Sequence, residues 1–216
     1  MLNQAQLETG NALDSNGYLR RKLARIVTNV TAPPLLAIPS FIGLGLYDQA
    51  HRPGNYNLGL SLGLALFFGS ILPILSVVML LLTGLVSDVH IGTRRQRTLP
   101  YSLTLASFAC GAVFLWLETG LCLLTALLIC YAVNSLIMML INLNWKISVH
   151  ASGLGGQIAV FTLVVGWAAL PLYALAVLVS WARIYLRAHT PGQVAAGSAL
   201  GFSLTLAQLI LLRQPS

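Results

Sequence analysis

Charged residues are scarce in this sequence. Only 8% of its 216 residues are charged, with five acidic against twelve basic side chains, whereas 57% are hydrophobic. A soluble domain carries about 25% charged residues. Because charges this sparse do not cover a soluble surface, the composition excludes a soluble domain and predicts an integral membrane protein.

Cysteines and carboxylates are also few, which argues against a metal centre. Cys110, Cys122 and Cys130 lie in apolar runs without metal-ligand spacing, so they are interpreted as small packing residues. Five carboxylates without a paired motif do not suggest a magnesium site. We therefore expect neither a metal nor another cofactor. No cleavable signal peptide is predicted, because the first apolar run begins late and lacks a small-residue cleavage pattern.

Long apolar runs, by contrast, are abundant and predict an all-α, polytopic transmembrane helix bundle. A spanning helix needs about 20 apolar residues, and seven candidate runs give an expectation of six to seven membrane helices. The runs are 27–47, 58–84, 101–117, 121–142, 154–168, 170–187 and 191–212. Pro33, Pro34 and Pro39 predict a kink or partial insertion of the first run. We expect a polar N-terminal tail at 1–26 and a transmembrane domain at 27–213.

Three polar islands, 88–100, 146–153 and 183–193, interrupt these runs and hold three of the four histidines. An apolar hairpin separates each island from the next, with breaks near Gly120 and Gly166. Because two crossings return the chain to the side that it left, all three islands should face one side of the membrane. The positive-inside rule places this basic side in the cytoplasm, and a bacterial inner or plasma membrane is the expected location.

The third island combines a histidine with two arginines at the end of a helix. Arg183 and Arg187 are four residues apart and share a helix face. Thr190 and Pro191 have the pattern of an N-cap followed by proline at the first helical position. His189 thus precedes a helix whose N-terminal amides favour an anion. A phosphate site is one interpretation, and a basic interfacial anchor is the other.

The second island places Lys146, Ser148 and His150 within five residues, followed by Gly153. Small residues after a histidine let backbone amides approach a ligand closely. A lone histidine in a membrane protein is usually a packing residue. The neighbouring Ser148 hydroxyl and Lys146 ammonium groups favour a functional role for His150.

The first island ends an apolar run with Asp88 and His90 and then turns through Arg94, Arg95 and Arg97. Three arginines this close together favour an anion site. A loop whose positive charge only fixes the membrane topology also explains them.

In order and spacing, the three islands resemble the type 2 phosphatidic acid phosphatases, an integral membrane family related in its core to vanadium haloperoxidases. The family pattern is a lysine, six residues and Arg-Pro, then Pro-Ser-Gly-His, then Ser-Arg, five residues, His, three residues and Asp. The matching residues here are His90, six residues and Arg97-Thr98, then Ile147-Ser148-Val149-His150, then Ala182-Arg183, five residues, His189, three residues and Gln193. The resemblance covers about residues 85–200.

The resemblance implies a haloperoxidase-like helical core and a catalytic pair of histidines. His189 would be the nucleophile that forms a phosphohistidine, and His150 would protonate the leaving group. Gln193 replaces the aspartate that orients the nucleophile; an amide can fix the imidazole tautomer but does not stabilise an imidazolium. Gly197 and Gly201 form a small-residue stripe that should turn Gln193 toward His189.

The resemblance also implies which residues bind the phosphate. Arg97, Ser148 and Arg183 would surround it and neutralise the charge that develops on its oxygens. His90 occupies the position of the family lysine, and Arg94 and Arg95 are the alternative candidates for that charge.

The expected function is hydrolysis of a lipid phosphomonoester or diphosphate, such as phosphatidate or a prenyl diphosphate, through a phosphohistidine. The glutamine at position 193 favours an alternative, a catalytically weakened relative that binds or transports lipid phosphates. A small transporter with purely topogenic loops is a further possibility, and a prenyltransferase is disfavoured. Lipid phosphates and membrane lipids are the expected partners, nucleic acid is not, and the sequence leaves the oligomeric state open.

Overall fold

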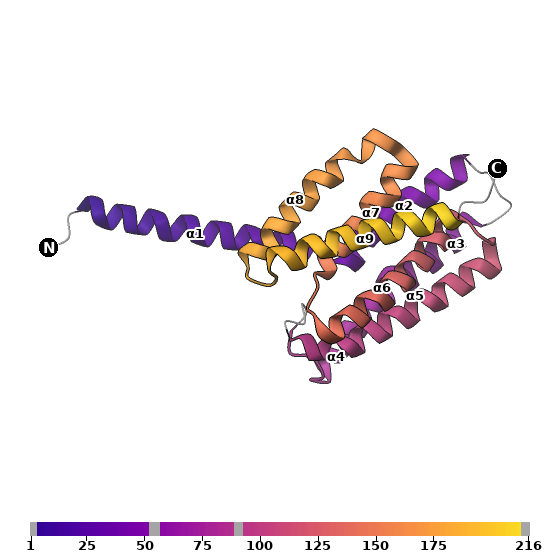
Figure 1. Cartoon of the computed structure of the whole chain (residues 1–216), viewed down its shortest axis with the longest axis horizontal. Helices are drawn as coiled ribbons and strands as arrows, with labels where there is room; N and C mark the ends of the chain where they lie inside the picture. Colours follow the sequence, from indigo (N-terminus) through magenta and orange to yellow (C-terminus); the bar gives the residue numbers. More distant parts are fainter. Residues whose placement is uncertain (1–3, 52–56, 89–92, 213–216) are drawn as a thin grey trace.

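The computed structural model describes residues 4–51, 57–88 and 93–212, and over these ranges the chain forms helices and turns without a strand (Figure 1). The long helices are α1 (Gln4–Val30), α2 (Pro33–His51), α3 (Leu58–Leu66), α4 (Leu72–Leu82), α5 (Thr98–Thr119), α6 (Leu123–Asn144), α7 (Val149–Val165), α8 (Leu170–Tyr185) and α9 (Pro191–Leu212). Short helical turns are η1 (Phe67–Ile71), η2 (Arg94–Arg97) and η3 (Gly166–Ala169).

Several of these helices are long and apolar enough to cross a membrane. Five candidate spans lie within the described residues, or six if the bent pair formed by α1 and α2 counts as one. The five are Leu58–Leu82, Thr98–Thr119, Leu123–Asn144, Val149–Tyr185 and Pro191–Leu212. The chain is therefore an all-helical, multi-pass membrane protein, with five or six candidate spans where the sequence predicted six to seven.

One of these candidate spans, Val149–Tyr185, doubles back on itself. A straight helix of its 37 residues would be about 55 Å long, nearly twice the hydrocarbon thickness of about 30 Å. Instead α7 ends before Gly166, which has a φ of 58°, and α8 returns beside it. Leu154 of α7 packs in one cluster with Val179 and Ala182 of α8. The predicted break near Gly166 is thus confirmed, and the two ends of this segment lie at the same end of the bundle.

The first apolar run is kinked, as its prolines predict. The axes of α1 and α2 differ by 52°, and α2 begins at Pro33 and Pro34. The expected boundary at residues 26 and 27 falls inside α1, whose N-terminal part projects away from the other helices (Figure 1). Ala24 and Val27 are buried in the cluster between α7 and α8, so the end of α1 is part of the bundle.

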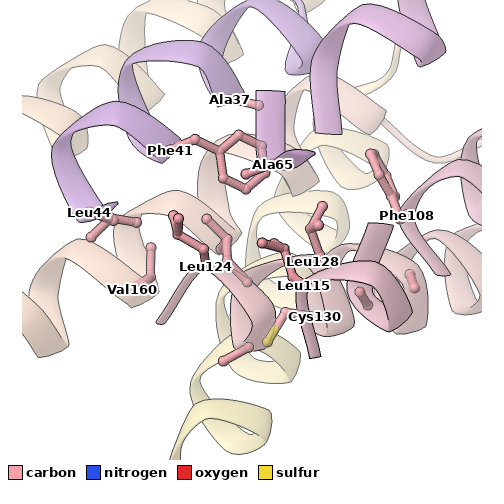
Figure 2. Close-up of a cluster of buried hydrophobic side chains, with 14 of the residues drawn as sticks. Ala37, Phe41, Leu44, Ala65, Phe108, Leu115, Leu124, Leu128, Cys130 and Val160 are labelled. Carbon is pink, nitrogen blue, oxygen red and sulfur yellow. The ribbon is translucent and has the colours of Figure 1, made fainter. Parts of the chain in front are cut away.

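The main hydrophobic core lies where α2, α3, α5 and α6 meet (Figure 2). Phe41 of α2, Leu115 of α5, and Leu124, Leu127 and Leu128 of α6 are completely buried in it. Inside a bilayer, such contacts associate helices through van der Waals packing. This core lies around the turn that joins α5 to α6. A separate cluster of Tyr101, Met138 and Ile147 packs at the opposite ends of these two helices, where two of the polar islands lie.

Helices α7 and α9 approach each other through their glycines, in agreement with the predicted small-residue stripe. A Cβ built on Gly197 would lie 2.7 Å from the carbonyl oxygen of Ser148, and one on Gly201 would overlap the carbonyl of Ser152. The Ser148 N–H also donates to the Gln193 carbonyl, 3.4 Å away. The N-termini of α7 and α9 are therefore held side by side, which brings the second and third islands together.

We expect Gly201→Ala to destabilise the protein, because its methyl group would meet the α7 backbone and force the two helices apart. Overpacking of this kind costs about 1–3 kcal/mol. Gly63→Ala on α3 is the matched control, since nothing lies within 4 Å of a Cβ at that position. Thermal unfolding of the purified variants in one detergent measures the difference. Equal midpoints for the two variants would contradict the close approach of α7 and α9.

Candidate anion-binding and catalytic site

The three islands and α1 enclose a cavity of about 270 Å³. Its walls come from α1, from η2, from the connection between α6 and α7, and from the end of α8. The lining residues are Arg21, Arg25, Thr28, Asn29, Arg97, Lys146, Arg183, Leu186 and Ala188. Residues far apart in the sequence thus meet at one end of the bundle, as the expected same-side arrangement of the islands requires.

Five basic side chains dominate this cavity. Arg97 and Arg183 are buried, with exposed fractions of 5% and 3%, whereas Lys146 is half-buried. Arg21 and Arg25 are exposed and belong to α1. Among the described residues, no carboxylate lines the cavity. The cavity therefore has an inner cationic part and a more exposed cationic part, and its charge suits an anion.

The inner cations lie close enough for their charges to act on one another. Burial lowers the pKa of Arg97, and Tyr101 and Asp88 oppose this effect in part. Burial also lowers the pKa of Lys146, and the positive charges of Arg97 and Arg183 lower it further. A bound phosphate would relieve this repulsion, because it places negative charge among the three cations.

Two buried hydrogen-bond donors in the cavity wall have no hydrogen-bond partner among the described residues. They are Nε of Arg183 and the hydroxyl of Thr28, which is 1% exposed. An unpaired buried polar group costs about 1–3 kcal/mol, more when it is charged. Both donors are groups that an acceptor-rich anion in this cationic cavity could satisfy.

The turn after α8 places His189 beside Arg183. Arg187 adopts a left-handed conformation with a φ of 53°, and the Ala188 and His189 N–H groups both donate to the Arg183 carbonyl, at 3.1 and 3.3 Å. This is the usual way in which a helix C-terminus satisfies its last carbonyls. His189 is thereby fixed by backbone geometry next to the cationic cavity.

Gln193 determines which nitrogen of His189 carries the proton. Its Oε1 lies 3.1 Å from Nδ1 of His189 and accepts the Thr190 N–H at 3.2 Å. Because a backbone N–H only donates, this amide atom must be the oxygen. The His189 Nδ1 therefore donates its proton to Gln193, and Nε2 keeps its lone pair. The structure thus contains the contact expected between these two side chains.

Gln193 also has a structural role that the sequence pattern did not bring out. Its N–H donates to the Thr190 hydroxyl at 3.3 Å, while its side chain accepts the Thr190 N–H. This reciprocal pair is a capping box at the start of α9. One amide oxygen therefore both caps the helix and orients the imidazole.

Burial and neighbouring cations keep His189 neutral. Burial is the largest cause that lowers its pKa, and the positive charges of Arg183, Arg97 and Lys146 lower it further. The hydrogen bond that His189 donates to Gln193 opposes them, and the resulting pKa is about 3, below the usual 6.5. With an exposed fraction of only 6%, His189 is a neutral imidazole at physiological pH. A neutral ring with an unprotonated Nε2 is the form that a nucleophile requires.

The two predicted site residues at the start of α7 have partners within the protein. Ser148 is fully buried and caps α7, since its hydroxyl accepts the Ala151 N–H at 3.4 Å. Nε2 of His150 lies 3.1 Å from the Thr28 carbonyl and so donates its proton to α1. Neither residue belongs to the lining of the cavity. His150 lies beside it, because its partner Thr28 is a lining residue, whereas the partner of Ser148, Gln193, does not line the cavity. His189 is also outside the lining and directly follows the lining residue Ala188.

Arg94 lies away from the cavity, at the end of α6. Its guanidinium donates to the carbonyls of Asn142 and Leu143, and the Asn142 side chain donates to the Arg94 carbonyl at 3.2 Å. Arginines commonly cap helix C-termini in this way. Arg94 therefore fastens η2 to α6 and positions Arg97, whose guanidinium donates to the Ile147 carbonyl at 3.3 Å. His90 lies outside the described residues.

The sequence analysis missed the contribution of α1 to this site. Arg21, Arg25 and Thr28 line the cavity from three successive turns of one helix. Their spacing of four and three residues is the helical signature of a shared face. That pattern is present in the sequence, within the segment that was predicted to be a polar tail and that forms part of α1.

In comparisons with protein-family models, with curated proteins and with solved structures, nothing matches this chain.

Proposed function

We propose that the protein is a membrane lipid-phosphate phosphatase that works through a phosphohistidine at His189, with a core of the type 2 phosphatidic acid phosphatase kind. The observation that supports this most directly is a neutral His189, oriented by Gln193, beside a cavity lined by five cations. An anion site alone would not need an oriented, deprotonated imidazole nitrogen. A structural histidine alone would not need the surrounding positive charge.

In the proposed reaction, Arg97 and Arg183 hold the phosphoryl oxygens and offset the charge that develops on them. Nε2 of His189 forms a bond to phosphorus while the bond to the leaving oxygen breaks. Water then attacks the phosphohistidine, the N–P bond breaks, and its electron pair returns to Nε2. The Nδ1 proton stays on the bond to Gln193 throughout, which keeps the ring in one orientation.

The proposed membrane arrangement places the cavity at the cytoplasmic face of a bacterial inner or plasma membrane. Arg21 and Arg25 line the same cavity as Arg97, Lys146 and Arg183, so the basic part of α1 and the islands share one end of the bundle. An excess of Lys and Arg in short segments favours the cytoplasmic side. Accessibility of a cysteine introduced at the exposed Arg187 to an impermeant thiol reagent in intact cells tests this orientation.

A second candidate function is binding or transport of lipid phosphates without turnover. The capping box favours it, because helix capping explains a glutamine at position 193 without any catalytic role. Phosphate release by the purified protein separates the two proposals, since a pure binding protein would hold a lipid phosphate and release none.

The Gln193→Glu variant tests the role assigned to the amide. Glutamate keeps the capping box and places a carboxylate beside Nδ1 of His189, so we expect turnover to rise. In the parent protein the pKa of His189 is about 3, so its protonation should not limit kcat/KM until the pH falls toward that value. The carboxylate should raise the pKa of His189 and move the acid limb upward by about 1–3 pH units.

Profiles of kcat/KM against pH for both proteins, on one substrate, provide the measurement. Gln193→Leu is the companion variant and should lower turnover, and a separate unfolding experiment accounts for its lost cap. If Gln193→Glu changes neither turnover nor the acid limb, Gln193 only caps α9.

A further inference from the structure

The part of the cavity formed by α1 is not needed to hold a single phosphoryl group. Arg97 and Arg183 already provide two guanidinium groups next to His189. On α1, Arg21 and Arg25 add two more cations, and Thr28 adds a buried hydroxyl without a partner. Arg21 and Arg25 are exposed, whereas Arg97 and Arg183 are buried. The α1 cations therefore form the outer part of the cavity, and the two buried arginines form its inner part.

We propose that α1 forms a second anion subsite, and that the preferred substrate is a lipid diphosphate rather than a lipid monophosphate. The terminal phosphoryl group would lie at Arg97 and Arg183, and the phosphoryl group attached to the lipid would lie against Arg21, Arg25 and Thr28. This inference rests on the proposed phosphatase function and names its substrate class.

The position of the proposed general acid favours the same substrate class. A lipid alkoxide is a poor leaving group unless it is protonated, and the resemblance assigns that proton to His150. Nε2 of His150 instead donates to the Thr28 carbonyl at 3.1 Å. A phosphoanhydride avoids this requirement, because its leaving group is a phosphate that surrounding cations stabilise.

The reaction on a diphosphate is balanced. The Nε2 lone pair of His189 forms a bond to the terminal phosphorus, and the bond between this phosphorus and the bridging oxygen breaks. The bridging oxygen keeps the electron pair and leaves as part of a lipid monophosphate, with its charge beside Arg21 and Arg25. Water then cleaves the N–P bond and releases inorganic phosphate, while the pair returns to Nε2.

The first test measures binding and does not depend on turnover. Methylenediphosphonate and methylphosphonate are non-hydrolysable probes with two and one phosphoryl groups. We expect the purified full-length protein to bind methylenediphosphonate about ten-fold or more tightly than methylphosphonate, because it makes additional charge-assisted hydrogen bonds. The double variant Arg21→Gln/Arg25→Gln should remove most of this ratio. Arg20→Gln/Lys22→Gln is the matched control, since both residues are exposed on α1 and do not line the cavity.

Equal binding of the two probes by the parent protein would overturn the second subsite. That result is also expected if Arg21 and Arg25 hold the phosphate of a neighbouring lipid instead. An equal loss of both probes in Arg21→Gln/Arg25→Gln would overturn it as well, because α1 would then serve a single phosphate site.

The second test compares phosphate release from a prenyl diphosphate and from the matching prenyl monophosphate. We expect the parent to prefer the diphosphate, and Arg21→Gln/Arg25→Gln to lower kcat/KM for it about ten-fold more than for the monophosphate. Turnover of both substrates with no preference would support the proposed phosphatase function and contradict the second subsite. If neither substrate is turned over but the expected binding ratio is found, the phosphatase function is contradicted and the second subsite is supported.

Discussion

Replacement of His189 by asparagine should abolish phosphate release while the protein still folds and binds phosphate. Asparagine keeps a donor for the Gln193 oxygen but has no nucleophilic ring nitrogen. Loss of a nucleophile lowers turnover by several orders of magnitude, so we expect a decrease of about 10⁴-fold or more. His51→Asn is the matched control, because His51 is exposed at the C-terminal end of α2, where its ring stacks on Tyr47.

A chemical measurement accompanies this variant. Rapid acid-free quenching of the parent protein with a phosphorus-labelled lipid phosphate should trap label on His189, identified by mass spectrometry of the digested chain. The label should be labile in acid and absent from His189→Asn. Turnover in His189→Asn at a rate near that of the parent would show that another group, or water itself, attacks the phosphorus.

Replacement of Arg183 by glutamine should have opposite effects on activity and stability. Arg183 is 3% exposed, and its Nε has no hydrogen-bond partner within the part of the chain that the structure describes. Without added phosphate, removing this charge should raise the free energy of unfolding by about 1–3 kcal/mol. The same change should lower kcat/KM by about 10²–10³, because a preorganised donor to the transition state is lost.

The comparison of Arg183→Gln with Arg187→Gln makes this test specific. Arg187 is exposed in the same turn and does not line the cavity, so its replacement should change neither property. Unfolding is measured in detergent without phosphate, and again with phosphate, which should stabilise only proteins that retain Arg183. Destabilisation of Arg183→Gln without ligand would identify Arg183 as a structural residue and not as part of an anion site.

Much of the helical framework could be predicted from the sequence, because the lengths of the apolar runs determine the helices and glycines mark the breaks between them. The runs at 58–84 and 191–212 became helices with nearly the expected bounds. The hairpin breaks occur at Gly120 and Gly166, which have φ values of 66° and 58° that favour glycine. Given these breaks, counting the membrane crossings predicts that the islands share one side. This prediction requires no information on which helices contact each other.

The partners of individual polar residues were harder to predict, because they depend on helix packing. Arg94 and Arg97 are three residues apart in one loop, yet Arg94 caps α6 and Arg97 lines the cavity. His150 was expected to point its proton at a substrate, and it donates to the α1 backbone instead. Charge and spacing identified the first island, but the packing of the helices determines which of its side chains lies in the cavity.

The cationic face of α1 was missed for a related reason. Polarity suggested a tail up to residue 26, but Ala24 and Val27 are buried in the bundle. Two small apolar residues at helical spacing were enough to fix α1 against α7 and α8. That docking turned Arg21 and Arg25 toward the cavity, and such a helix is difficult to recognise when its polar residues outnumber its apolar ones.

The central claim is that this cavity cleaves phosphate from a membrane lipid with the side chains of the chain itself. Release of inorganic phosphate from a panel of lipid phosphates and diphosphates, by the purified full-length protein with and without a chelator, tests it most directly. We predict release that a chelator does not change and that depends on His189. Absence of release from every lipid in the panel, by a protein that remains folded, would contradict the account.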